Sequence, residues 1–205
     1  MTSVVLVNSR VSNIDSVSRA ISRCGGDPVV TEDPKVVEKA DRLILPGVGS
    51  FGTAMRTLHD SGLAGAILSL LHTRDIPFLG ICLGMQLMAD MGYEHGETAG
   101  LGLIHGEVVS LQSTKPDERV PHIGWNTVQN AADCPLLKGI PENSDFYFVH
   151  RYHFKCSDPK SVQATTPSYG GFAAIVGEGN RFGTQFHPEK SQAAGFALFK
   201  NFLSL

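Results

Sequence analysis

Cys82 lies between two glycines in the segment Gly80–Gln86, which reads GICLGMQ and follows an apolar run that ends at Leu79. A Gly-x-nucleophile-x-Gly pattern is typical of a tight strand-to-helix turn that exposes a reactive side chain. The first N–H groups of the helix that follows would favour the thiolate, which is the attacking form of cysteine. The segment therefore predicts a nucleophilic cysteine. A glycine-rich turn whose cysteine only packs is the alternative from these residues alone.

A cysteine nucleophile needs a base and a group that orients the base. The segment Gly183–Glu189 reads GTQFHPE and supplies His187 and Glu189, two residues apart. Residues two apart share a face in extended chain, and Pro188 favours an extended His187. His187 could then carry the proton while Glu189 fixes the ring and stabilises the imidazolium. A strand that ends in a surface turn is the alternative for an isolated His-Pro-Glu.

A third glycine-bearing segment, Pro46-Gly47-Val48-Gly49, follows an apolar run. Open α/β sheets place their sites at the carboxyl ends of strands. The two glycines allow backbone orientations that aim N–H groups at a substrate oxygen, and the N–H of Leu83 could be a second donor. We therefore expect an oxyanion hole made by Gly47, Val48, Gly49 and Leu83, with an ordinary strand-to-helix turn as the alternative.

Short apolar runs alternate with helical patterns along the first half of the chain. The expected strands are residues 4–7, 29–30, 43–45 and 76–79. The expected helices are residues 14–24, a helix capped by Asp33 with Pro34 in its first turn, stretches between 50 and 74, and a helix after Cys82. This alternation predicts a parallel sheet with helices on both faces.

The second half reads mostly as strands separated by turn residues. The expected strands are residues 108–109, 120–128, 146–149, 162–165, 172–176 and 182–186. Residues 91–102 are expected to be an irregular loop, and Ser191 is expected to cap a last helix. Together the patterns predict an α/β fold in a single domain over residues 1–205: a mostly parallel central sheet with an added antiparallel region.

Composition narrows the function classes. The formal net charge of −3 and the absence of a long apolar run argue against electrostatic binding of nucleic acid and against a membrane span. We expect a cytoplasmic protein. Its four cysteines match no metal or redox spacing, and His150 and His153 lack further nearby ligands, so no metal and no cofactor are expected. The four cysteines are Cys24, Cys82, Cys134 and Cys156.

With these segments together, the chain resembles the class I (triad) glutamine amidotransferases, and among them the glutaminase subunits of imidazole glycerol phosphate synthase. GICLGMQ and the later His-Pro-Glu mark the class. The finer resemblance rests on PGVGSFGTAM at 46–55, PHIGWN at 121–126, FVHRY at 148–152 and GTQFHPEKS at 183–191. It covers nearly the whole chain and implies a flavodoxin-like architecture.

The resemblance implies that Cys82, His187 and Glu189 hydrolyse L-glutamine through a thioester. It implies that ammonia passes to a (β/α)8-barrel cyclase subunit in a heterodimer. The side chains implied to help hold glutamine are Gln86 and Glu94, with backbone between Tyr147 and Arg151. The residues implied to face the cyclase are Asn13, Trp125, Asn126 and Lys190. Core packing for Trp125, a helix start for Asn13 and a solvated charge for Lys190 are the alternatives.

Two positions depart from the family pattern. Residues 9–13 read SRVSN where a glycine before the asparagine is common, and Arg151 stands where a small hydroxyl residue is common. Two other classes of function also stay open from the sequence. One is a free-standing hydrolase, such as a γ-glutamyl peptidase or cysteine protease on this architecture, and the other is a catalytically silent binding subunit.

Overall fold

The structure is a computed structural model, and it describes residues 2–9, 13–130 and 133–205. Its strands are β1 (Thr2–Val7), β2 (Gly26–Thr31), β3 (Leu43–Gly47), β4 (Phe78–Cys82), β5 (Met91–Gly92), β6 (Thr98–Ala99), β7 (Gly106–Ser110), β8 (His122–Thr127), β9 (Gln129–Asn130), β10 (Asp145–His150), β11 (Tyr152–Cys156), β12 (Val162–Thr166), β13 (Phe172–Glu178) and β14 (Arg181–Thr184). Its α-helices are α1 (Ile14–Arg23), α2 (Pro34–Val37), α3 (Phe51–Asp60), α4 (Leu63–Thr73), α5 (Leu83–Gln86) and α6 (Gln192–Ser204).

An eight-stranded sheet forms the centre of the molecule, in the order β2-β1-β3-β4-β14-β13-β12-β9. The five strands from β2 to β14 are parallel, and the remaining pairings are antiparallel. The predicted α/β fold, with a mostly parallel sheet and an antiparallel extension, is confirmed. The inner parallel strands β1, β3 and β4 are short, mostly apolar and buried because both of their faces are covered.

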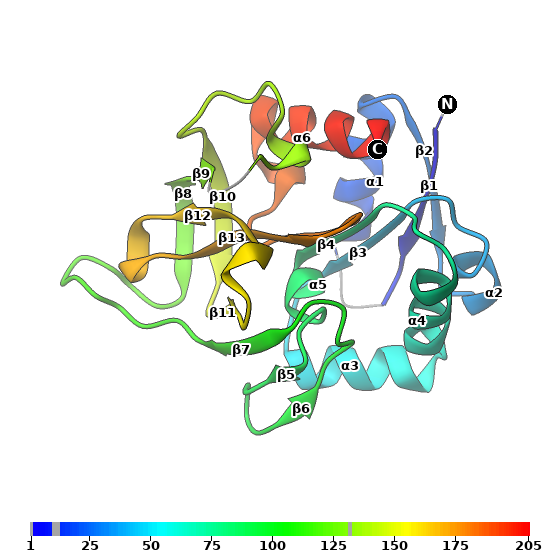
Figure 1. The fold of residues 1–205 in the computed structure, drawn as a ribbon, viewed down its shortest axis with the longest axis horizontal. Helices are drawn as coiled ribbons and strands as arrows, with labels where there is room; N and C mark the ends of the chain where they lie inside the picture. Colours follow the sequence, from blue (N-terminus) through cyan, green and yellow to red (C-terminus); the bar gives the residue numbers. More distant parts are fainter. Residues whose placement is uncertain (1, 10–12, 131–132) are drawn as a thin grey trace.

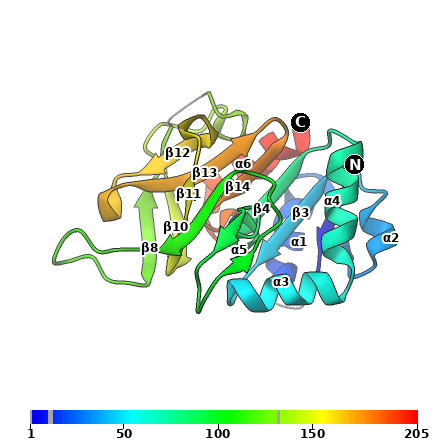
Figure 2. The same cartoon turned by 60° about the horizontal axis from the view of Figure 1, so that its bottom comes forward.

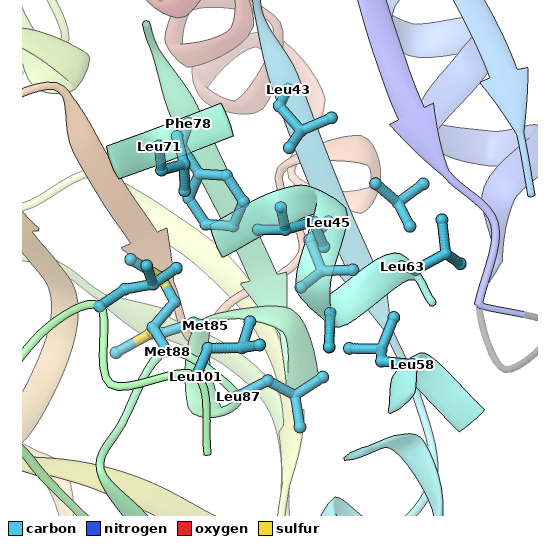
Figure 3. Close-up of a cluster of buried hydrophobic side chains, with 14 of the residues drawn as sticks. Leu43, Leu45, Leu58, Leu63, Leu71, Phe78, Met85, Leu87, Met88 and Leu101 are labelled. Atoms are coloured by element: carbon cyan, nitrogen blue, oxygen red, sulfur yellow. The ribbon is translucent and has the colours of Figure 1, made fainter. Parts of the chain in front are cut away.

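Alternate residues of the parallel strands enter two separate cores. Val5 and Val7 pack with α2, α3 and α4 in one cluster, whereas Val4 and Leu6 pack with α1 and α6 in the other. Figure 1 shows these two groups of helices on opposite sides of the sheet, and Figure 2 shows α4 beside β3, with α3 along the bottom of the view. Figure 3 shows the first core, where Leu45 and neighbouring strand residues meet leucines of the helices.

The second half differs from the prediction in how its strands group. Strands β8 and β10 pair as a separate two-stranded sheet, and β11, β7, β5 and β6 form a four-stranded one. The short strands β5 and β6 lie in the region expected to be an irregular loop. Strand β11 was missed as well, although its sequence YHFKC alternates apolar and polar residues as a half-buried strand does.

One of the two predicted helix caps forms the expected hydrogen bond, and the other does not. The Asp33 carboxylate accepts a hydrogen bond from Lys35 N at 2.9 Å, as expected for a cap. Ser191 is the N-cap residue of α6, but its hydroxyl makes no cap bond because it is bonded to other backbone groups. None of the helices in the described part of the chain is long and apolar enough to cross a membrane.

Candidate active site

Cys82 is the last residue of β4 and directly precedes α5, so the strand ends on the cysteine itself and not at Leu79 as expected from the sequence. Its φ of 54° and ψ of −108° are unusual for a residue with a side chain. A Cβ at Gly84 would overlap the carbonyl oxygen of Leu45, and one at Gly80 would lie 2.6 Å from the carbonyl oxygen of Gly84. Both flanking glycines are therefore required by close backbone packing, and the cysteine holds the strained turn typical of a nucleophile elbow.

His187 and Glu189 form a buried pair beside this turn. The distance from His187 Nδ1 to Glu189 Oε1 is 2.8 Å, and the two side chains are 3% and 1% exposed. The other ring nitrogen, Nε2, is buried and makes no hydrogen bond to any residue that the structure describes. The carboxylate thus fixes the ring through Nδ1 and leaves Nε2 for proton transfer.

The protonation of His187 depends on its neighbours. Burial of the ring acts to lower the pKa of His187, but the adjacent Cys82 and Glu189 outweigh burial and raise that pKa to about 10. Cys82 and His187 line the same cavity, although no hydrogen bond joins Nε2 to the sulfur in this conformation. Such a pair can hold a thiolate beside an imidazolium, which is the reactive state of a cysteine nucleophile.

The backbone of Tyr147 holds the histidine segment in place. Its carbonyl oxygen accepts the His187 N–H at 2.9 Å, and its N–H donates to Ser191 Oγ at 3.0 Å. The same hydroxyl donates to the His187 carbonyl oxygen at 2.7 Å. Tyr147 therefore uses both backbone groups to hold the segment of the His187–Glu189 pair, and it does not line the cavity at Cys82.

The other cysteines lie in a different environment. Burial raises the pKa of Cys24, Cys134 and Cys156, in the last case to about 11. These three thiols stay protonated at neutral pH, so they lack the thiolate character that Cys82 can gain from His187.

A cavity of about 230 Å³ opens at Cys82. This volume is below the roughly 300–1,000 Å³ of pockets for drug-sized ligands, which suits a substrate as small as an amino acid. The residues that line it include most of the predicted site: Val48, Gly49, Cys82, Leu83, Gln86, Glu94, Val149, His150, Arg151, Tyr152, His187 and Lys190.

The predicted oxyanion segment lies beside the elbow. Gly47 is the last residue of β3 and pairs with Cys82 in the parallel ladder. A Cβ at Gly47 would lie 3.0 Å from Gly84 N, and Gly49 has a φ of +99° that favours glycine. Val48 and Leu83 both reach the cavity. The four residues are brought together, and their donation to an oxyanion stays a prediction.

The side chains predicted to hold glutamine already make hydrogen bonds within the protein. Gln86 Nε2 donates to the Tyr152 carbonyl oxygen at 2.8 Å and to Gln185 Oε1 at 3.0 Å, which leaves its own oxygen for a ligand. Glu94 Oε2 accepts from Phe51 N at 2.6 Å, at the start of α3. The carbonyl oxygen of Arg151 accepts from Leu111 N at 2.9 Å.

Sequence reasoning missed two contacts to the sulfur and one further residue of the cavity. The Val149 carbonyl oxygen lies 3.7 Å from Cys82 Sγ, and Gln185 Nε2 lies 3.9 Å from it. His150 lines the cavity and is hydrogen-bonded to Tyr152 O. All of these residues lie in the FVHRY and GTQFHPEKS segments, but nothing in one sequence marks which of their atoms turn toward Cys82.

The residues predicted to face a partner lie outside the cavity, except Lys190. Trp125 is 48% exposed on β8, so it is not a core residue. Asn126 points to the other face of that strand, where its amide donates to Ser168 Oγ at 2.6 Å. Lys190 Nζ lies 5.8 Å from the centre of the Tyr147 ring. Asn13 is the N-cap residue of α1, and of the departing segment 9–13, residues 10–12 lie outside the described part of the chain.

Comparison with known proteins tests the resemblance directly. The model of the family described as glutamine amidotransferase class-I matches residues 5–205. The chain belongs to this class I glutamine amidotransferase family.

Curated members of the family give a finer similarity. The chain is 42% identical to the imidazole glycerol phosphate synthase subunit HisH 1 of Campylobacter jejuni (strain RM1221), over 98% of this chain and 100% of the relative. It is 43% identical to subunit HisH of Rhodospirillum rubrum, over 98% of this chain and 97% of the relative. It is 44% identical to subunit HisH 1 of Vibrio vulnificus (strain YJ016), over 98% of both chains.

Solved structures of amidotransferases share the fold. PurLQS from Thermotoga maritima matches with a TM-score of 0.77 at 20% identity, over 98% of this chain and 97% of that chain. A structure described as a glutamine amidotransferase matches with a TM-score of 0.76 at 17% identity, over 98% and 99% of the two chains. At this identity the likeness concerns the fold of the class I amidotransferase and not its substrate.

Proposed function

We propose that this chain is the glutaminase subunit of an imidazole glycerol phosphate synthase in L-histidine biosynthesis. It would hydrolyse L-glutamine and deliver the ammonia to a cyclase subunit. The observation that carries the proposal is the buried His187–Glu189 pair beside Cys82 at one small cavity. The names of relatives that are 42–44% identical over almost the full chain support the choice among amidotransferases.

The reaction would proceed in two acyl transfers. The Cys82 thiolate attacks the side-chain amide carbon of glutamine, and the oxyanion that forms is bound by N–H groups near Val48 and Leu83. His187 gives its Nε2 proton to the departing nitrogen, so ammonia leaves and a γ-glutamyl thioester remains. His187 then takes a proton from water as the water attacks the thioester, and glutamate and the thiolate are released.

Substrate recognition would use the rest of the cavity. The Gln86 amide has its nitrogen bonded on two sides, so its oxygen is the group that can accept from the α-ammonium of glutamine. Glu94 carries a second acceptor at the same cavity. Arg151 could bind the α-carboxylate, or could contribute backbone alone as its position in the family suggests.

The partner would be a (β/α)8-barrel cyclase in a heterodimer. The cyclase would combine ammonia with a phosphoribulosyl-formimino carboxamide ribonucleotide and release imidazole glycerol phosphate and aminoimidazole carboxamide ribotide. Ammonia that escaped into water would be protonated and lost to the ring closure, so transfer inside a complex is favoured. Exposed Trp125 is the proposed aromatic anchor of the interface, together with Asn13, Asn126 and Lys190.

The test is a glutaminase assay of the purified chain with and without a barrel cyclase and its nucleotide ligand. We expect weak hydrolysis alone, strong stimulation by the liganded cyclase, and co-purification of the two chains at one to one. High activity that the cyclase does not change would favour a free-standing hydrolase. Absence of glutamine hydrolysis in the complex would reject the proposal.

A further inference from the structure

Gln185 is a buried polar residue at the end of β14 whose side chain reaches the nucleophile. It is 0% exposed, and its backbone N–H donates to the Ala174 carbonyl oxygen at 2.9 Å, which ties it to β13. Its side chain lies between Gln86 and Cys82, with Oε1 3.0 Å from Gln86 Nε2 and Nε2 3.9 Å from Cys82 Sγ. A fully buried amide held this way needs partners at both of its ends.

The orientation of this amide is fixed by its neighbours. The carbonyl oxygen of Tyr152 can only accept, so the Gln86 group 2.8 Å from it must be the NH₂. The second hydrogen of that NH₂ points to Gln185, which must therefore present its oxygen. A flipped Gln185 would set two NH₂ groups against each other. The Gln185 NH₂ consequently faces the sulfur.

A second series of hydrogen bonds holds the Tyr152 carbonyl oxygen in position. His150 Nδ1 lies 2.8 Å from that carbonyl oxygen and so carries the hydrogen, which leaves His150 Nε2 to accept from His122 Nδ1 at 3.1 Å. The Tyr152 oxygen thus receives hydrogen bonds from both His150 and Gln86. The contact between Gln185 and Cys82 is the last member of a network that runs through buried groups from β8.

The Val149 carbonyl oxygen and the Gln185 amide favour different protonation states of the Cys82 sulfur. The Val149 carbonyl oxygen, 3.7 Å away, can accept from the thiol but has nothing to accept from a thiolate. An N–H from Gln185 can donate to both forms and bonds the charged one more strongly. We propose that Gln185 is a positioning residue that orients the Cys82 sulfur and stabilises its thiolate. This role deepens the proposed glutaminase function and rests on it.

The test is the pH profile of Cys82 alkylation by iodoacetamide, with labelled peptides resolved by mass spectrometry. Gln185→Met keeps length and burial but removes both the donor to the sulfur and the acceptor for Gln86. Gln185→Glu keeps the acceptor for Gln86 but sets an oxygen against the sulfur. We expect the midpoint of the profile to rise by roughly one pH unit in Gln185→Met, since a hydrogen bond to a charged group is being lost. The rise in Gln185→Glu should be larger.

Thr184→Val is the matched control. Thr184 is also 0% exposed and next in the chain, but its hydroxyl donates to the Phe186 carbonyl oxygen at 3.2 Å and not to the sulfur. The profile of Cys82 should not move in this variant, and Cys156, labelled in the same tube, should keep its profile in every variant.

An unchanged Cys82 midpoint in a folded Gln185 variant would overturn the inference. An equal rise in Thr184→Val would do the same, because it would assign the effect to loosening of the segment. The readout needs no glutamine turnover. Failure of the wild-type chain to hydrolyse glutamine would therefore contradict the proposed function. If the Gln185 variants still showed the expected shift of the Cys82 midpoint, the role of Gln185 would stay in place.

Discussion

His122 Nδ1 and His150 Nε2 lie 3.1 Å apart, and the two buried imidazoles bridge β8 and β10. Burial is the main cause that lowers the pKa of His122 to about 4 and that of His150 to about 3. Nearby His122, His153 and His187 add repulsion against a charge on His150. Both rings are therefore neutral near pH 7, which leaves His150 Nε2 unprotonated to accept the bond from His122.

This pair should make the protein acid-sensitive. Both pKa values are lower in the folded chain than the ordinary 6.5, so the unfolded chain binds protons more readily. The stability they contribute is complete above pH 6.5 and is lost as the pH falls toward 4. For buried His150 the loss at pH 5 is about 2 kcal/mol. The difference in thermal unfolding between wild type and a His150 variant from pH 8 to pH 5 measures it, because the raised pKa of His187 adds stability in both proteins as the pH falls.

The matched variant is His150→Gln, which keeps a polar side chain but cannot be charged. We expect it to be less stable at pH 8, because the bonds to His122 and Tyr152 are disturbed, and to show a shallower fall in melting temperature on acidification. An equally steep fall would mean that other groups cause the acid sensitivity. His72→Gln, at an exposed position of α4, should leave the pH dependence unchanged.

The parallel half of the fold was predictable because apolar runs, glycines and helix caps act locally. Residues 4–7, 43–45 and the cap at Asp33 carry their structure in their own neighbourhood. The separate pairing of β8 with β10 was not predictable, because no local residue pattern shows which of the strands in the second half pair with one another. The same limit explains the missed β5 and β6, two-residue strands that exist through pairing alone.

The residues of the site also fall into those that the sequence could predict and those that it could not. Cys82, His187 and Glu189 could be predicted as a catalytic set because their residue types and spacing are specific to a chemistry, and their catalytic roles stay a prediction. Gln185 was overlooked although it lies two residues before His187. Its role depends on a side-chain contact across the sheet, and strand alternation alone places a glutamine in the core without naming its partner.

Gly84 should tolerate no side chain. A Cβ there would overlap the Leu45 carbonyl oxygen, which belongs to the paired strand β3 and cannot move without breaking the sheet. We expect Gly84→Ala to lower the free energy of unfolding by about 3 kcal/mol or more. Gly65→Ala is the control, since its Cβ meets nothing within 4 Å in α4 and should raise stability by about 0.5–1 kcal/mol. Denaturant unfolding measures the free energy of unfolding of both variants. Similar free energies in the two variants would contradict the close packing described around Gly84.

Cys82→Ala should separate the two reactions of the complex. Without the sulfur no thioester forms, so glutamine-dependent synthesis of imidazole glycerol phosphate should be abolished. Synthesis from added ammonium salts should persist, because it needs only the cyclase. Following product formation from each nitrogen source checks this. Cys134→Ala, at a buried thiol away from the cavity, should retain both reactions. Equal loss of both in Cys82→Ala would contradict the division of labour.

Trp125→Ala should weaken the complex but not the fold. Trp125 is 48% exposed, and its ring packs edge-on against the Tyr147 ring with 5.9 Å between centroids. We expect a loss of cyclase affinity of about 10-fold or more, as for other buried aromatic anchors, with an unchanged melting temperature. Val30→Ala is the control, at a 43% exposed residue on β2, the far edge of the sheet. Titration calorimetry should distinguish them, and equal affinities would place the interface elsewhere.

Glu189→Gln should lower turnover and leave glutamine affinity nearly unchanged. The carboxylate is 1% exposed and bonds His187 Nδ1 at 2.8 Å, so the change removes a charge that stabilises the imidazolium without altering the cavity lining. An amide can also donate to Nδ1 and select the wrong tautomer. We expect kcat to fall by about 10²- to 10⁴-fold with KM within a few-fold. Glu178→Gln, an exposed match at the end of β13, should behave as wild type. A change confined to KM would instead assign Glu189 to substrate binding, because a residue that acts through the base must affect the chemical step.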